Sequence, residues 1–156
     1  MNAEFKRLLQ LVMNIVKIGT VRRYNPENHT AVVEFKDFES VVSRELQIVE
    51  PFTYQNKNYM PLREGQKAIC ILLPQSGTTD GFIIGTVYDD DNLPPVRDKN
   101  KFHTKFEDGT VIEYDTAKHK LTANVKGKIF IHATGNVTVI SNKNVLVKAK
   151  RIDFNP

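Results

Sequence analysis

Residues 119–150 read HKLTANVK, GKIFIHAT, GNVTVISN and KNVLVKAK, four units of eight residues in a constant register. The third, fifth and seventh places of every unit hold apolar or small residues, and all of these places carry odd numbers. Because the side chains of a β-strand alternate between two faces, this pattern predicts one narrow apolar face along the whole segment. Gly127 and Gly135 each begin a unit, where a residue without a Cβ permits a bend once per repeat.

The apolar face of this repeat needs a partner to be buried. A single-chain β-helix needs longer coils or many more short turns to enclose an interior. An isolated segment also leaves its strand edges unpaired. Several copies around one axis would enclose the apolar face and pair the strand edges. Three copies with small Val, Ile and Ala side chains fill a thin prism without a channel. The alternative is that the repeat forms ordinary hairpins on the preceding domain.

We therefore predict a triple-stranded intertwined β-helix over residues 102–156, formed by a homotrimer. Ile152 and Phe154 occupy even positions, so the apolar register shifts at the end of the segment, and Phe154 from three chains is predicted to close the core. The predicted trimer core consists of Leu121, Ile129, Ile131, Val137, Val139, Val145, Val147 and Phe154.

A small β-barrel is predicted before the repeat, over residues 19–88. Short β-runs alternate there with turn sequences, and closure into an OB-fold barrel would remove the exposed edges of so few strands. Other small barrels stay possible. The predicted strands are Thr20–Tyr24, Ala31–Phe35, Val41–Ile48, Lys67–Leu73 and Phe82–Val87.

Two further segments complete the expected organisation. Phe5, Leu8, Leu9, Val12, Ile15 and Val16 recur at three- and four-residue steps, which predicts an amphipathic helix over about residues 2–17, within an N-terminal segment 1–18 that Gly19 ends. Its apolar stripe would pack either on its own domain or on neighbouring subunits. Residues 89–101, rich in Asp and Pro at their start, are predicted to be a linker, and Phe106–Val111 a hairpin turn with Asp-Gly at its tip.

Composition limits the possible classes of protein. The 156 residues suffice for one domain with an appendage or for two small domains, and no apolar run approaches the roughly 18 residues that span a bilayer. No signal peptide is recognised at the start.

A net charge of +4 permits contact with acidic partners, but the lysines are spread along the chain. Cys70, the single cysteine, lies in an apolar run and is predicted to be a core residue, so an intrachain disulfide is excluded.

Two other functions can be compared with the sequence. An OB-type barrel can bind single-stranded nucleic acid, and Arg22, Arg23, Tyr24 and Phe35 are the candidate contacts. For an enzyme, no phosphate-binding loop, Cys/His cluster or nucleophile motif is present. Glu107 and Asp108 resemble a pair of catalytic carboxylates, but turn chemistry accounts for Asp108-Gly109. We predict a protein that is not an enzyme and has no cofactor.

The order of these parts resembles a known family. An N-terminal helix, a barrel beginning Gly19-Thr20-Val21, the strand Gly81–Val87 and the tail of eight-residue units together resemble the phage baseplate assembly protein V family of central tail spikes, which are similar to the type VI secretion VgrG spikes.

The resemblance implies a homotrimeric spike at the tip of the baseplate hub in a contractile phage tail or a phage-tail-like injection machine. Its barrels would dock on the tail hub or tube and other baseplate proteins, and its β-helix would pierce the host cell envelope. The protein would be assembled in the bacterial cytoplasm and reside in the tail baseplate of the virion, and a separate protein is a possible cap for its tip. Some such spikes bind a metal through a His-x-His pair near the tip. Here the last histidine is His132, at an outward even position, so no metal is predicted.

Overall fold

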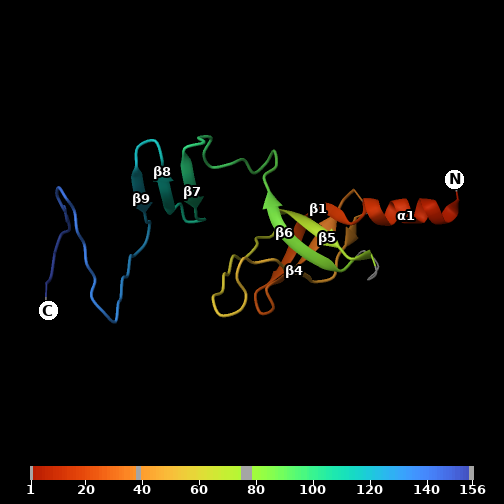
Figure 1. The fold of residues 1–156 in the computed structure, drawn as a ribbon, viewed down its shortest axis with the longest axis horizontal. Helices are drawn as coiled ribbons and strands as arrows, with labels where there is room; N and C mark the ends of the chain where they lie inside the picture. The colour runs from red at the N-terminus through yellow and green to blue at the C-terminus, as the bar shows by residue number, and fades with distance from the viewer. Residues whose placement is uncertain (1, 38–39, 75–78, 155–156) are drawn as a thin grey trace. The chain divides into compact units, whose positions relative to one another are not determined.

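The computed structural model describes residues 2–37, 40–74 and 79–154 of the chain. It divides into two compact units, Met1–Pro94 and Pro95–Pro156. The boundary lies inside the segment that the sequence marks as a linker. Figure 1 shows a helix and a curved sheet in the first unit, and a small sheet followed by a long extended trace in the second. The fold is mainly β with one short N-terminal helix.

Helix α1 (Ala3–Met13) is shorter than the sequence pattern predicts. Asn2 caps its start, because the side-chain oxygen accepts a hydrogen bond from Glu4 N at 3.2 Å. The helix ends before Asn14, and Val16 already pairs with Ile71 in a β-ladder. The helical spacing of Val16 in the sequence is therefore misleading, since its backbone hydrogen bonds go to a neighbouring strand.

Six strands form the sheet of the first unit: β1 (Val16–Asn25), β2 (Thr30–Phe35), β3 (Val41–Val42), β4 (Leu46–Ile48), β5 (Lys67–Leu72) and β6 (Gly81–Val87). The sheet order is β1-β5-β6-β4-β2-β3, and β1 also pairs with β2. Five strands therefore close into a barrel, with β4 and β6 parallel and the other neighbours antiparallel. This arrangement is OB-like, which confirms the predicted barrel.

The predicted strand Val41–Ile48 is two strands, because the chain leaves the ladder at Ser43. The Ser43 hydroxyl accepts a hydrogen bond from Val33 N at 2.9 Å and donates one to Arg44 O at 2.6 Å. Arg44 N in turn donates to Thr79 O. Side-chain hydrogen bonds of this kind compete with regular pairing and divide the strand.

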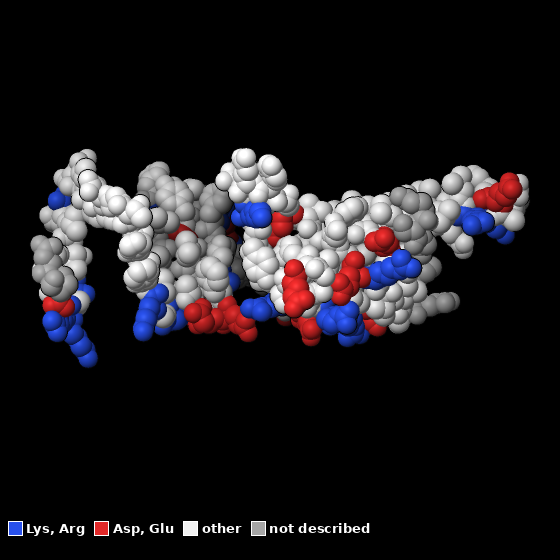
Figure 2. All heavy atoms as spheres, turned by 90° about the horizontal axis from the view of Figure 1, so that it is seen from below, with Lys and Arg blue, Asp and Glu red and all other residues white. Residues whose placement is uncertain are grey.

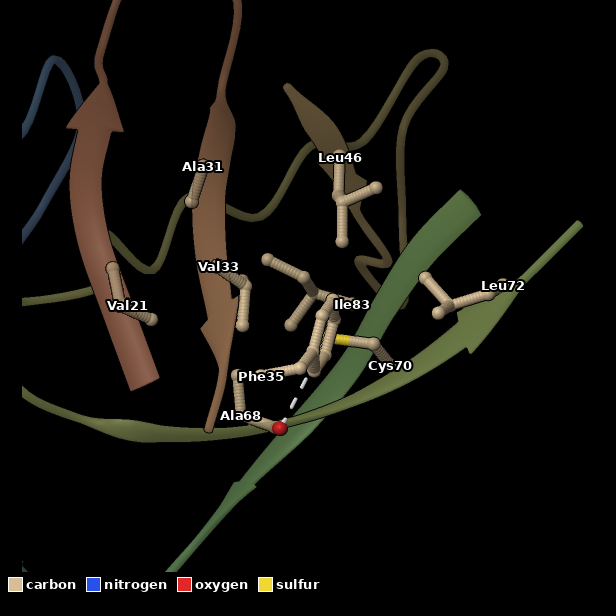
Figure 3. Close-up of a cluster of buried hydrophobic side chains, with 9 residues drawn as sticks. All are labelled: Val21, Ala31, Val33, Phe35, Leu46, Ala68, Cys70, Leu72 and Ile83. Atoms are coloured by element: carbon tan, nitrogen blue, oxygen red, sulfur yellow. Dashed lines mark hydrogen bonds between the residues drawn. The ribbon is translucent and has the colours of Figure 1, made fainter. Parts of the chain in front are cut away.

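The barrel interior is packed by nine buried side chains that point toward one another from β1, β2, β4, β5 and β6 (Figure 3). Cys70 is among them, as predicted, and burial raises the pKa of its thiol to about 12. Gly19 lies in β1 and does not end the helix. A Cβ at this position would lie 2.7 Å from the carbonyl oxygen of Glu34, so glycine allows β1 and β2 to approach closely. The core residues are Val21, Ala31, Val33, Phe35, Leu46, Ala68, Cys70, Leu72 and Ile83.

The second unit begins with three antiparallel strands, β7 (Lys101–Lys105), β8 (Val111–Asp115) and β9 (Lys120–Asn124), in the order β7-β8-β9. The predicted turn joins β7 to β8. Phe106 N donates to Thr110 O at 2.9 Å, Gly109 has a φ of 82°, and Asp108 accepts a hydrogen bond from Thr110 N at 2.8 Å. Turn chemistry is therefore the role of Asp108-Gly109.

Residues 125–154 contain no helix and no strand paired within the chain, and every residue from 126 to 154 is exposed. Figure 1 shows them as an extended trace beyond β9. The first unit of the repeat differs from the rest, because Leu121 and Ala123 belong to β9, which pairs with β8 of the same chain. The predicted shaft segment thus starts with a sheet made within one chain.

Candidate functional site: an apolar interaction surface

The three-stranded sheet of the second unit has one charged face. Glu113 on β8 lies between two partners on β7: Lys101 Nζ is 2.9 Å from its Oε1, and His103 Nδ1 is 2.8 Å from its Oε2. The hydrogen bonds from Lys101 and from His103 lower the pKa of the Glu113 carboxyl, and the bond to Glu113 raises the pKa of Lys101. The three groups hold β7 and β8 together on this face.

The opposite face of the same sheet is apolar and exposed. Phe102 of β7 lies opposite Tyr114 of β8, which lies opposite Leu121 of β9, and Ile112 is two residues before Tyr114 on the same face. Phe102 is 72% exposed and Leu121 71%. Contiguous exposed apolar surfaces are typical of interaction sites in folded proteins, which makes this face a candidate. We refer to Phe102, Ile112, Tyr114 and Leu121 as the apolar sheet face.

The remaining predicted core residues lie in the extended segment after β9. The single chain leaves them unburied: Ile131 is 76% exposed and Val139 73%. Among the residues that the structure describes, no strand pairs with this segment, so its backbone groups also have no ladder partner there. The exposed residues of the predicted core here are Ile129, Ile131, Val137, Val139, Val145, Val147 and Phe154.

Leu121 connects the two surfaces, because it belongs both to the apolar sheet face and to the odd-numbered set of the repeat. The predicted seam therefore shares Leu121 with a sheet face that the sequence pattern did not indicate as a whole. The sequence pattern did not single out Phe102, Ile112 and Tyr114, although the alternation in Phe102–Thr104 and Ile112–Tyr114 is the signal that indicates them.

His132, at an even position, stacks on Phe130 with ring centroids 6.3 Å apart.

The barrel residues considered for nucleic-acid binding do not form an open basic site. Arg22 pairs with Glu34, and Arg23 lies 3.2 Å from Glu45. Phe35 is a core residue and therefore cannot stack on a base, so its assignment as a contact was wrong. Figure 2 shows acidic and basic side chains interspersed on the visible side of the barrel.

Tyr24, the fourth candidate, has its hydroxyl occupied by neighbouring residues. It lies 2.9 Å from His29 Nδ1 and 2.9 Å from the Tyr59 hydroxyl. Burial and the hydrogen bond to Tyr59 raise the pKa of Tyr24 to about 12. The Nε2 atom of His29 lies 2.9 Å from Glu50, and Glu50 accepts a further bond from Met60 N. These contacts fasten the loop before β5 to the β1–β2 turn.

Among the residues that the structure describes, no group of three or more His, Cys, Asp and Glu side chains is placed to hold a metal ion. Within the same residues, no helix has the length and apolar character needed to cross a membrane.

The sequence matches no protein-family model, and no significant match was found among curated proteins.

Proposed function

We propose that this protein is a structural subunit of a homotrimeric central spike, at the tip of the baseplate hub in a contractile phage tail or a related injection machine. The observation that carries the proposal is the set of apolar residues that a single chain leaves exposed in the second unit, on the sheet and along the following segment. Sister chains that share this surface would bury it and pair its backbone.

The arrangement suits a structure loaded along its axis. In a trimer, strands of three chains would alternate around a dry core, and each chain would pair with both neighbours. Bending or unfolding one chain would then break ladder hydrogen bonds with two others. Lys126, Lys128, Lys148 and Lys150 occupy even positions and would keep the outside of the shaft soluble.

The partners follow from the resemblance to the baseplate assembly protein V family. The OB-like barrel would dock on the tail hub or tube and on baseplate proteins, and the shaft would pass transiently through the host envelope. Its location would be the baseplate of the virion tail or of a phage-tail-like particle, and a separate protein would cap the tip. No catalytic step, metal or cofactor is assigned to the chain.

Sedimentation of the full chain tests the oligomeric state. We expect a stable species of three times the 17.8 kDa chain mass, and an electron micrograph should show a thin rod projecting from a wider head. A monomer at working concentration would end the proposal. A trimer without the rod would keep the assembly but reject the spike.

A further inference from the structure

The outside of the barrel carries a second apolar surface, across β1, β5 and β6. Strand β5 is apolar on both sides: Ala68, Cys70 and Leu72 fill the core, and the alternate residues point outward. The ladders place neighbouring outward residues side by side, with Val16 opposite Ile71, Ile18 opposite Ile69 and Ile71 opposite Phe82. We call this set the outer barrel face. It comprises Val16, Ile18, Ile69, Ile71, Phe82 and Ile84.

The β1 and β6 sides of this face are open to solvent in the single chain, and Ile69 and Ile71 between them are half-buried. Val16 is 58% exposed and Ile18 54%, although a solvated strand face would ordinarily alternate apolar with polar residues. Strands that are apolar on both sides are typical of sheets covered on both sides. The outer barrel face therefore requires a cover.

Helix α1 also leaves its apolar residues exposed to solvent. None of its residues is buried, and its apolar stripe consists of Phe5, Leu8, Leu9 and Val12, of which Leu8 is 57% exposed. The helix has 11 residues and is thus about 16 Å long, whereas three neighbouring strands extend over about 10 Å. The stripe is long enough to cross the outer barrel face.

The connection between helix and barrel disfavours a conformation in which the helix covers its own barrel. Asn14 N donates to the carbonyl oxygens of Gln10 and Leu11, and Ile15 N donates to Val12 O. On the other side, Leu72 N donates to Ile15 O at 2.7 Å. Both residues between α1 and β1 are thus held by backbone hydrogen bonds, and folding the helix back would break them.

We infer that the α1 stripe of one copy packs on the outer barrel face of the next copy, so that three copies close a ring. The inference rests on the proposed trimer and names a contact in it that is separate from the shaft. Each copy carries both halves of the contact, which is the condition for a head-to-tail interface that closes by rotation. The shaft would hold the three barrels near one another and so raise the effective concentration of every helix at its neighbour's face.

Disulfide formation between the two surfaces tests the contact. The full chain carrying Leu9→Cys and Phe82→Cys is oxidised and run on a denaturing, non-reducing gel. The native Cys70 can stay, because it is buried in the core. We expect covalent trimers, since each helix would be joined to a different chain. If the first double variant does not fold, the same test can be made with Val12→Cys and Ile84→Cys.

The matched control is Gln10→Cys with Phe82→Cys, because Gln10 follows Leu9 directly but lies on the polar side of α1. It should remain monomeric on the gel. Cross-linked monomers would mean that the helix folds onto its own barrel, and cross-linking no greater than in the control would mean that another partner covers the face. Either result overturns the inference. Sedimentation of the unoxidised variants separates these failures from that of the proposed function, since the shaft trimer persists if only the helix contact is wrong.

Discussion

Strand β5 and the tail segment after β9 use the same side-chain pattern with opposite outcomes. In β5, Ala68 and Cys70 alternate with outward residues and are fully buried. In the tail, Val137 and Val139 alternate just as regularly, yet Val139 is 73% exposed. The difference lies in the chain that surrounds them. Turns bring four further strands back around the barrel interior, whereas no strand in the described part of the chain returns to pair with residues 125–154. Alternation of apolar and polar residues decides which face of a strand is apolar, but burial of that face depends on whether other segments pack against it.

The largest expected effect comes from a charge placed in the tail seam. Val139→Asp would bury three carboxylates at one level of the proposed trimer, at a cost on the order of 10 kcal/mol. We expect loss of the trimer in sedimentation, with the barrel still folded. Thr138→Asp is the matched control on the adjacent outward position and should leave the trimer intact. If both variants stay trimeric, the tail is not the trimer core.

The second prediction concerns a substitution inside the barrel core, away from the tail. Leu46 is fully buried, so Leu46→Ala should cost about 2 to 5 kcal/mol of unfolding free energy through lost contacts and a residual cavity. Calorimetry should show a lower unfolding temperature for the barrel, while sedimentation still reports a trimer. The neighbouring Gln47→Ala, at an exposed position, should change neither quantity. Loss of the trimer in Leu46→Ala would mean that barrel closure and tail assembly are not separable.

A smaller effect is expected from acid on the sheet of the second unit. Because Lys101 and His103 lower the pKa of Glu113, the carboxylate contributes stability that is present above its unfolded pKa and is lost as pH falls through the lower folded value. The protection of the β7 and β8 amides against hydrogen exchange, corrected for the intrinsic pH dependence of exchange, should therefore fall below about pH 4. In Glu113→Gln this pH dependence should be reduced, with faster exchange already at neutral pH. Glu64→Gln, an exposed site in the other unit, should leave it unchanged.

The smallest effect is expected at the turn between β7 and β8. Gly109 has a φ of 82°, where a Cβ costs about 1 kcal/mol, so Gly109→Ala should destabilise this hairpin slightly. Gly109→Asn should cost less, because asparagine tolerates the left-handed region. Hydrogen exchange at Phe106 N, which bonds to Thr110 O, reports the difference. Equal effects of the two substitutions would show that backbone conformation is not the cause.

The sequence predicts the barrel and its connections well, because turn chemistry and alternation are local signals. It misplaces the end of α1, since the spacing of Val16 suits a helix as well as a strand and only pairing with Ile71 decides between them. It joins β3 and β4 into one strand, because the hydrogen bond from Val33 N to the Ser43 hydroxyl, which helps to separate them, is a tertiary contact. For the candidate site, it finds the seam of the tail but misses Phe102 and Tyr114, which join Leu121 only once β7 and β8 have paired.

The sequence by itself determined which face of each strand is apolar, where the turns lie and that the tail repeats in units of eight. These properties follow from side-chain chemistry and from the two-residue period of a strand. The tertiary structure alone decided which apolar faces one chain can bury. Phe35 became core because the barrel closes around it, whereas most of the outer barrel face, the apolar sheet face and the tail seam stay exposed. Burial requires a second surface at contact distance, and no local pattern specifies where that surface comes from.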